Sequence, residues 1–212
     1  MIITCWSVKG GSGTTVVAAS LALLLGRKSD HGALLVDLAG DAPAVLGMAE
    51  PTGMGVGDWL DGAGGDLASL LQHQVEAASS VRLLPMGIRT LAAGAPLMEA
   101  LSGEQRTVVI DAGVLSLGPS LDVIANATTS LLVLRPCYLA LRRASLAPVR
   151  PSGVVLVSEP GRALGRKDIE SVLGVPVVAD VLTDPNIARA VDAGLLAGRL
   201  PRTLARSLRS AA

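Results

Sequence analysis

The sequence contains no phenylalanine, one tyrosine and two tryptophans in 212 residues, although half of its residues are apolar. The core must therefore be built from alanine, valine, leucine and isoleucine, a mixture typical of a parallel sheet covered by helices. Charged residues make up only 17% of the chain, which leaves enough apolar side chains for a large core. The length suits one domain, and we expect residues 1–212 to form it.

Cysteine is also scarce. Cys5 and Cys137 form neither a C-x-x-C motif nor a metal-binding spacing, and Cys5 lies in an apolar run where a core residue is expected. No apolar run approaches the roughly 18 residues of a membrane span, and no secretory leader precedes the first apolar run. We expect a cytoplasmic protein, with association to the nucleoid or to a membrane left open.

The charge balance is zero overall but uneven along the chain. Residues 1–134 carry six basic and twelve acidic side chains, whereas residues 135–212 carry twelve and six. Such a separation favours self-association or a polyanionic partner. If folding interleaves the two halves, much of the electrostatic field of this charge separation is cancelled. The sequence leaves both interpretations open.

A glycine-rich turn lies between a short apolar run and a second run long enough for a helix. The turn consists of Lys9, Gly10, Gly11, Ser12, Gly13, Thr14 and Thr15. Its three glycines lack a Cβ, so the backbone can approach an anion closely. The N–H groups of the turn and of the helix's first residues point at the same spot, and Thr14 and Thr15 bring hydroxyls within reach of a phosphate or its magnesium ion. The stretch predicts a phosphate-binding loop.

Two further apolar runs each end in an acidic residue. Residues 33–36 are followed by Asp37, and residues 106–110 by Asp111. Carboxylates at the carboxyl ends of strands lie where open α/β sheets bind their ligands. Two such strands downstream of one phosphate loop are more specific than any of the three features alone, and they predict a nucleotide site with magnesium.

On these residues the chain resembles the MinD/ParA group of P-loop ATPases, whose deviant Walker A loop reads K-G-G-x-G-K-[ST]. Lys9 matches the signature lysine and Thr15 the magnesium-binding hydroxyl, whereas Thr14 occupies the place of the usual P-loop lysine. A small residue there also resembles the CpaE/TadZ branch, the pilus-positioning relatives. The resemblance implies ATP and Mg²⁺ as cofactors.

The resemblance also implies roles for single residues. Lys9 and Asp37 would be catalytic, with Asp37 near the γ-phosphate and the attacking water, and Asp111 would be the Walker B acid. The implied magnesium ligands are Thr15, Asp37 and Asp111. The group often has a second acid two residues after the first, but Ala39 stands there, and Asp41 would substitute only if the loop bends it inward. Alternatively, Asp37 only caps the turn that comes after it.

The adenine site is implied by two later segments. After the apolar run of residues 154–157 the group often has an asparagine that reads the base, and Ser158 takes its place here. Residues 182–185, which include Asp184, stand where the group packs a loop beside the base. Ser158 and Asp184 are therefore the predicted base contacts.

Apolar runs and helical segments alternate to the end of the chain, without a repeat, linker or low-complexity tract. This order predicts an α/β, doubly wound, mostly parallel sheet of about seven strands, with helices on both faces and the phosphate-loop strand near its centre. The expected strands are residues 2–8, 33–36, 81–84, 106–111, 130–134, 154–157 and 175–181. The middle of the chain is expected to hold short helices at residues 43–48, 56–60, 66–75 and 92–101.

Three functions fit these features. The first is a ParA/MinD-like ATPase that forms a homodimer on ATP through Lys9, hydrolyses ATP slowly and positions a cargo. The second is a scaffold that has lost hydrolysis, as Thr14 and Ala39 suggest. The third is a metabolic relative, such as an ATP-dependent ligase or an iron–sulphur carrier, which the lack of a cysteine pair disfavours. The cargo, an activator protein and any higher assembly are not specified by the sequence.

The C-terminal residues 199–212 are basic and contain no acidic side chain. The basic residues are Arg199, Arg202, Arg206 and Arg209. Leu200, Leu204 and Leu208 are spaced by four, so they share one face of a helix. The leucines are expected to dock on the core, and the arginines either remain in solvent or contact DNA non-specifically; without an aromatic residue, membrane insertion is disfavoured.

Overall fold

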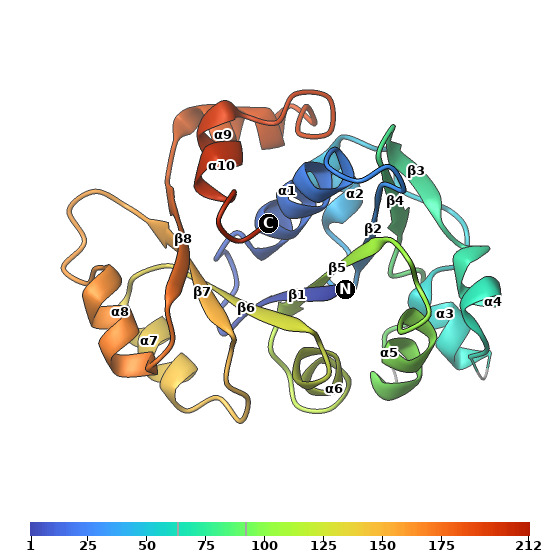
Figure 1. Ribbon diagram of the computed structural model, residues 1–212, viewed down its shortest axis with the longest axis horizontal. Helices are drawn as coiled ribbons and strands as arrows, with labels where there is room; N and C mark the ends of the chain where they lie inside the picture. Colours follow the sequence, from blue (N-terminus) through green and yellow to red (C-terminus); the bar gives the residue numbers. More distant parts are fainter. Residues whose placement is uncertain (63, 92) are drawn as a thin grey trace.

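The computed structural model describes residues 1–62, 64–91 and 93–212. Its centre is an eight-stranded sheet with the strand order β3-β4-β2-β5-β1-β6-β7-β8 (Figure 1). Every neighbouring pair is parallel except β3 and β4. The predicted α/β class is therefore confirmed, and the first strand lies near the centre of the sheet.

The strands are β1 (Ile2–Ser7), β2 (Ala33–Asp37), β3 (Val75–Ala78), β4 (Val81–Leu84), β5 (Thr107–Val114), β6 (Thr129–Leu134), β7 (Gly153–Ser158) and β8 (Val177–Leu182). Seven of them correspond to predicted strands. The helix predicted over residues 66–75 is present, but its predicted end was wrong, because the helix spans Leu67–Leu71 and β3 begins at Val75. A four-residue strand at the sheet edge, with three half-buried residues and one exposed, shows too little alternation to be recognised from the sequence.

The helices are α1 (Thr14–Gly26), α2 (Ala42–Leu46), α3 (Val56–Asp61), α4 (Leu67–Leu71), α5 (Ala95–Leu101), α6 (Pro119–Ala125), α7 (Tyr138–Ser145), α8 (Arg166–Leu173), α9 (Pro185–Asp192) and α10 (Arg202–Ser207). The predicted helix at residues 92–101 is present as α5, and its first residue, Ala92, lies outside the described residues. No helix within the described ranges combines the length and the hydropathy needed to cross a bilayer.

The helices form a layer on each face of the sheet (Figure 1). One layer contains α1, α2, α9 and α10, and the other contains α3 to α8. Alternate residues of a strand supply the two faces: Cys5 of β1 packs under α1, whereas Trp6 faces α6 and α7. Burial on both faces explains why the strands read as continuous apolar runs.

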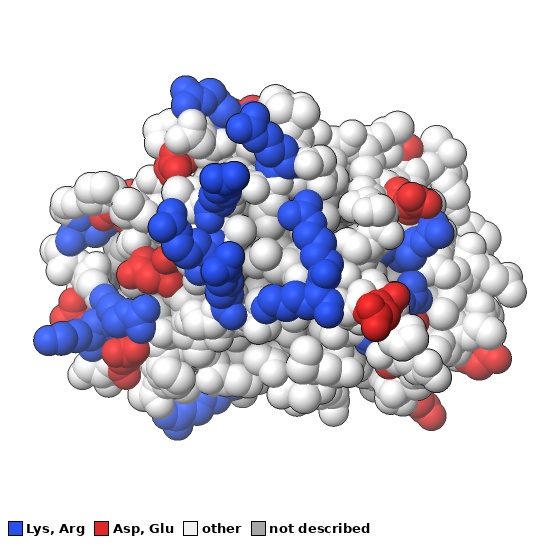
Figure 2. Space-filling model, turned by 45° about the horizontal axis from the view of Figure 1, so that its top comes forward, with Lys and Arg blue, Asp and Glu red and all other residues white. Residues whose placement is uncertain are grey.

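Helix α1 is apolar on all sides because it lies between the sheet and the C-terminal segment. Leu200, Leu204 and Leu208 of that segment are buried and join the apolar cluster around α1. The predicted docking of the leucine stripe is therefore confirmed. The four arginines of the segment are exposed, and Figure 2 shows Lys and Arg side chains gathered on this face of the molecule.

Helix α9 has no fully buried residue, and Ile187 and Val191 pack half-buried against the apolar cluster around α1. Just beyond its C-terminal end, Gly194 meets Gly47 at the end of α2 so closely that a Cβ on Gly47 would collide with the carbonyl group of Gly194. Both glycines have a positive φ, 73° at Gly47 and 63° at Gly194, so neither position accepts a side chain without strain.

Candidate functional site

The glycine-rich turn joins the end of β1 to the start of α1. Hydroxyl groups fix its path: Ser12 Oγ donates to the carbonyl oxygen of Lys9 at 2.7 Å, and Ser7 Oγ lies 3.2 Å from the same oxygen. Gly11 and Gly13 have φ of 72° and 88°, a left-handed conformation that favours glycine. The turn is therefore held by its own polar side chains and leaves its outer surface free.

Packing does not explain why this turn contains glycine. A Cβ on Gly10, Gly11 or Gly13 would have no atom within 4 Å, so the space beside each of them is open. Gly13 precedes α1 and provides no side-chain cap, so the N–H groups of the first turn of this 13-residue helix are left for a ligand. Open space beside unpaired N–H groups at a helix start suits an anion.

A cavity of about 530 Å³, lined by both polar and apolar residues, lies in front of this turn. The glycine turn, the loop after β2, helix α2 and the end of β5 form its walls. The residues that line it include Gly10, Gly11, Ser12, Gly13, Thr14, Thr15, Ala39, Asp41 and Gly113. The structure thus brings the predicted phosphate loop and the segments after both acidic strands to one cavity.

Asp37 is buried, and its carboxylate is occupied by backbone groups. Its Oδ1 accepts hydrogen bonds from the N–H groups of Ala39 at 3.0 Å and Gly40 at 2.7 Å, and its Oδ2 accepts one from Ala42 at 2.9 Å. Burial raises the pKa of Asp37, and these hydrogen bonds oppose the rise. These hydrogen bonds fix the loop after β2 around Asp37, as expected of a residue that caps the turn.

Asp111 lies beside Asp37 in the sheet, since the two residues are partners in the parallel pairing of β2 with β5. Its Oδ1 accepts a hydrogen bond from Gly113 N–H at 3.1 Å, whereas its buried Oδ2 has no hydrogen-bond partner among the described residues. Burial raises the pKa of Asp111 to about 6, the nearby hydroxyl of Thr15 lowers it, and the negative charges of Asp37 and Asp41 raise it further.

The cavity suits a magnesium ion that arrives with phosphate groups. Mg²⁺ is usually held by one or two carboxylates together with substrate phosphates and water. The unpaired Oδ2 of Asp111 and the nearby Thr15 hydroxyl are donors of this kind. No group of three or more metal-ligating side chains occurs in the described part of the chain, so an all-protein cage is not present there.

Lys9 and Thr14 of the glycine turn lie in different environments. Lys9 is exposed and forms no ion pair within the described ranges, so its ammonium group is available to an anion. Thr14 lines the cavity but is only 7% exposed. Position 14 therefore presents a largely buried neutral hydroxyl to the cavity.

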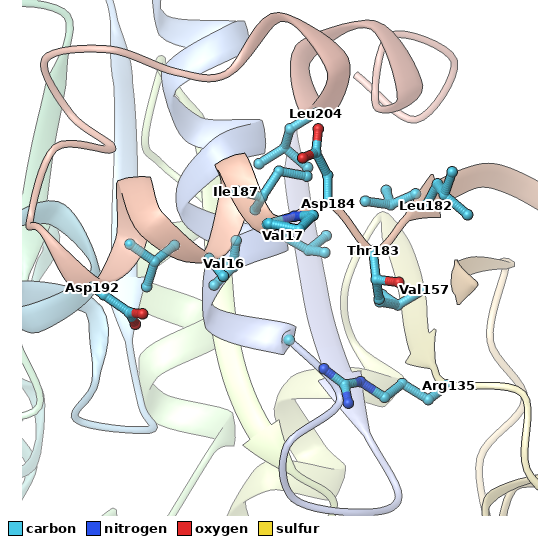
Figure 3. A pocket seen from close by; sticks show the side chains of 15 residues that line it. Val16, Val17, Arg135, Val157, Leu182, Thr183, Asp184, Ile187, Asp192 and Leu204 are labelled. Atoms are coloured by element: carbon cyan, nitrogen blue, oxygen red, sulfur yellow. The ribbon is translucent and has the colours of Figure 1, made fainter. Parts of the chain in front are cut away.

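A second, mostly apolar cavity of about 490 Å³ adjoins the first (Figure 3). Val16 and Val17 of α1 form one wall and Ile187 and Val191 of α9 the opposite wall. Gly13 and Val16 line both cavities, so a ligand whose phosphates rest on the turn can place an apolar ring between α1 and α9.

The two predicted base contacts lie in different environments. Asp184 lines the apolar cavity, but its carboxylate caps α9: Oδ1 accepts from Asn186 N–H at 2.8 Å, and Oδ2 accepts from Thr203 Oγ1 at 3.2 Å. These hydrogen bonds, led by that of Asn186, lower the pKa of Asp184. Ser158 is not among the lining residues, because its hydroxyl donates to Asp180 Oδ1 at 2.6 Å in the neighbouring strand.

Sequence reasoning missed one cationic group of this site. Arg135, at the end of β6, lines the apolar cavity, and Figure 3 shows its side chain reaching toward the start of α1. Its side chain is 48% exposed and pairs with Glu159 at 3.3 Å. An arginine directly after an apolar strand was the available signal, since that position lies at the ligand edge of the sheet.

Known structures share this architecture. The ParA family ATPase from Chlorobium tepidum TLS superposes with a TM-score of 0.76 and 18% identity over 98% of this chain and 95% of that one. The cell division ATPase MinD from Pyrococcus furiosus gives a TM-score of 0.76 and 22% identity over 100% and 99%. The septum site-determining protein MinD from Pyrococcus horikoshii OT3, in complex with Mg-ADP, gives 0.75 and 19% over 99% and 93%.

The similarity lies in the structure rather than in the sequence. No protein-family model matches the sequence, and no curated protein matches it. Identities of this size establish the fold alone. The chain has the fold of the MinD and ParA ATPases, over nearly its whole length and nearly the whole of theirs.

Proposed function

We propose that the protein binds an adenine nucleotide with Mg²⁺ and works as a ParA/MinD-like ATPase that positions a cellular cargo. The observation that carries the proposal is the open glycine turn in front of a cavity that Thr15 lines, with the buried Oδ2 of Asp111, unpaired among the described residues, near the Thr15 hydroxyl. Similar structures support it: the Pyrococcus horikoshii MinD is complexed with Mg-ADP, and a putative plasmid partition protein from Borrelia burgdorferi is bound to AMPPNP.

Each part of the site has a task in this proposal. The backbone N–H groups of residues 10–15 bind the phosphates, and the apolar walls of α1 and α9 hold the base. Asp111 and Thr15 hold the magnesium ion, which neutralises phosphate charge during phosphoryl transfer. Lys9 is the free cation of the turn.

Hydrolysis is expected to be slow. A neutral hydroxyl at Thr14 cannot stabilise the charge that develops in the transition state, and such groups commonly supply several kcal/mol. Ala39 lines the cavity without contributing a carboxylate. We expect turnover below about one per second, near the low end of the usual range for enzymes.

Calorimetry tests the binding. Mg-ADP and Mg-ATP should bind to the wild type, and Asp111→Asn should weaken both. Asp30→Asn makes the same change in the turn after α1, at the opposite edge of the sheet, and should bind as the wild type does. Absence of nucleotide binding by the wild type would overturn the proposal.

We propose a homodimer that forms on ATP and not on ADP, with Lys9 acting across the interface. Lys9→Ala should abolish ATP-dependent dimerisation and leave the fold intact, because an exposed charge contributes little to stability. Lys28→Ala removes an exposed lysine from the turn after α1 and is the matched control. Light scattering that finds the Lys9 variant dimerising as well as the control would exclude this role.

The exposed C-terminal arginines are the proposed contact to DNA. Two copies in a dimer would act together, so weak non-specific binding should strengthen with ATP and fall steeply with salt. A variant with Arg202, Arg206 and Arg209 changed to Ala should lose retardation of DNA in gels at low salt. Equal retardation by the variant and the wild type would leave the segment a structural element only.

A non-hydrolysing scaffold is the second candidate, favoured by the burial of Thr14 and by Ala39. A turnover assay on wild-type protein that binds Mg-ATP separates the two candidates. We also propose that residues 1–212 are one domain, since a single sheet carries all three apolar clusters. One cooperative unfolding transition is the expected result.

A further inference from the structure

We infer that the apolar cavity between α1 and α9 accepts the base of any purine nucleotide, guanine as readily as adenine, and that position 183 is the place from which a side chain can recognise this base. The inference rests on the proposed function and names the specificity of the same site. It differs from the prediction made from the sequence, which assigned a base contact to Ser158. Its basis is the small number of polar groups that are free to face the cavity.

Ser158 lies on the other face of the sheet. Alternate residues of a strand point to opposite faces, and Val157 in β7 lines the cavity on the face that α1 covers. Leu156 belongs to the apolar cluster on the opposite face, and Ser158, two residues later, follows it. Asp180, which accepts a hydrogen bond from the Ser158 hydroxyl at 2.6 Å, is the register partner of Leu156 in β8. Ser158 is therefore directed away from the cavity and is held there.

The side chains that face the cavity are apolar along most of its walls. The main ones are Val16, Val17, Val157, Val181, Ile187 and Val191. Apolar walls bind a flat ring by removing it from water, which is a non-directional effect and does not depend on the hydrogen-bonding groups at the edge of the ring. The rim is exposed at Leu182 and Pro185, so the edge of a bound base keeps its contact with water.

The loop after β8 uses most of its backbone N–H groups internally. The N–H group of Thr183 donates to the carbonyl oxygen of Ser158 at 2.9 Å, and the first turn of α9 donates to the carbonyl oxygen and the carboxylate of Asp184. Position 185 is a proline, which has no N–H group. Within residues 183–188 of the described chain, the N–H group of Asp184 alone forms no hydrogen bond. A single donor finds an acceptor, such as N7, on either purine.

The carboxylates that line the cavity are not placed to recognise the base. Asp184 caps α9, with Oδ1 accepting from Asn186 N–H at 2.8 Å and Oδ2 accepting from Thr203 Oγ1 at 3.2 Å. Asp192 is the last residue of α9, about 10 Å along the helix axis from its first residue. Figure 3 shows Asp192 at the opposite end of the cavity from Thr183.

Arg135 lies toward the phosphate end of the cavity. Figure 3 shows its side chain reaching toward the start of α1, where Gly13 joins this cavity to the one in front of the glycine turn. A guanidinium group only donates hydrogen bonds, and it pairs well with phosphate oxygens. Phosphates are common to all nucleotides, so Arg135 does not separate one base from another.

Thr183 is the polar side chain that is best placed beside the base. It is half-buried and lines the cavity from the loop after β8 (Figure 3). A hydroxyl both donates and accepts, so it pairs equally well with the amino group of adenine and with O6 of guanine. An amide offers an acceptor and a donor side by side, which suits N6 and N7 of adenine. Thr183→Asn should therefore create a discrimination that the wild type lacks.

Calorimetry with Mg-ADP, Mg-GDP and Mg-CDP measures the specificity. The dissociation constants of the wild type for ADP and GDP should agree within about threefold, because the two bases bury nearly the same ring area. CDP has a single ring that buries less apolar surface and should bind about three- to tenfold more weakly than ADP. Thr183→Asn should raise the preference for ADP over GDP by about tenfold, within the range of a bidentate contact to adenine.

Two further variants act as controls. Ser158→Asn introduces the same amide on the opposite face of the sheet and should leave the ratio of the ADP and GDP affinities at the wild-type value. Thr183→Val removes the hydroxyl without adding an amide and should also leave this ratio unchanged, because the hydroxyl favours neither purine.

The possible results separate this inference from the proposed function. A preference of the wild type for one purine over the other by clearly more than about threefold would overturn the inference and leave nucleotide binding standing. Equal affinities for ADP and CDP would show that the base lies outside the cavity, which also overturns it. An unchanged ratio in a folded Thr183→Asn variant would overturn the assignment of position 183. A wild type that binds no nucleotide overturns both the inference and the proposed function.

Discussion

Asp37 and Asp111 terminate two apolar runs in strands that lie side by side, and they are paired in the sheet register. Both are buried, with exposures of 1% and 0%, and burial raises the pKa of both. Yet Asp37 accepts three backbone hydrogen bonds, whereas Asp111 accepts one and leaves Oδ2 unpaired among the described residues.

The difference comes from the path of the chain after each acid. After Asp37 the chain turns at Gly40 and returns its N–H groups to the carboxylate. After Asp111 the strand continues to Val114, so only Gly113 returns an N–H group. The same motif, an apolar run ending in an acid, therefore yields a carboxylate held by three backbone N–H groups in one place and, in the other, a buried carboxylate with one oxygen unpaired among the described residues.

Replacing each acid by asparagine should change the free energy of unfolding very differently at the two positions, and this is the largest effect that we expect. Asp37→Asn places an amide N–H₂ group against backbone donors, and we expect a loss of about 4 kcal/mol in the free energy of unfolding. Asp111→Asn removes the charge whose burial raises the Asp111 pKa, so at pH 7 the free energy of unfolding should stay equal or rise, by at most about 3 kcal/mol. Urea denaturation of the two variants measures the contrast, and equal losses would contradict it.

The pH dependence of stability should reveal Asp111 in the nucleotide-free protein. Its pKa is about 6 in the folded state against 3.8 as the ordinary value. The folded state therefore binds this proton more tightly than the unfolded state does, so the stabilisation is complete below pH 3.8 and is lost as the pH rises through 6. The loss amounts to up to about 3 kcal/mol.

Asp111→Asn isolates this contribution, because every other titrating group is retained. The wild type minus variant difference in unfolding free energy should fall between pH 4 and pH 6.5. Parallel curves for the two proteins would show that the Asp111 carboxyl is not desolvated in solution.

The stability of the protein should depend more on Asp37, whereas magnesium-dependent ADP binding should depend more on Asp111. Asp111→Asn is expected to reduce magnesium-dependent ADP affinity by ten- to a hundredfold, the range seen when support of a metal site is lost. The comparison is ADP binding with Mg²⁺ and with EDTA, by calorimetry. A variant that retains the full magnesium effect would remove Asp111 from the site.

A substitution of Gly40, in the turn after Asp37, should have the smallest effect on stability. Gly40→Ala meets no neighbouring atom, so its cost is the left-handed backbone alone, about 1 kcal/mol. Gly161→Ala is the control, since Gly161 has a φ of 80° and is equally open. Only Gly40→Ala should also weaken nucleotide hydrolysis, and equal effects on hydrolysis would contradict a role of this turn in the site.

The sequence was sufficient for the parts that depend on local pattern. The glycine turn, the two acid-ended strands and the docked leucines were all predicted from spacing, and the alternation of runs predicted the parallel sheet. Distant partners were not predictable. Ser158 turns to Asp180, which is 22 residues away and adjacent only because β7 pairs with β8. The three N–H groups on Asp37 likewise depend on the loop conformation.

Helix α9 gives the molecule a segment of low local stability. Its eight residues include none that is buried; Ile187 and Val191 are half-buried against the apolar cluster around α1 and also line the cavity. Opening this helix exposes only half-buried apolar side chains, so its amides should exchange with deuterated solvent long before those of the neighbouring strands. A ligand between α1 and α9 would supply the missing contacts, and the exchange rate of this single helix would then report when the cavity is occupied.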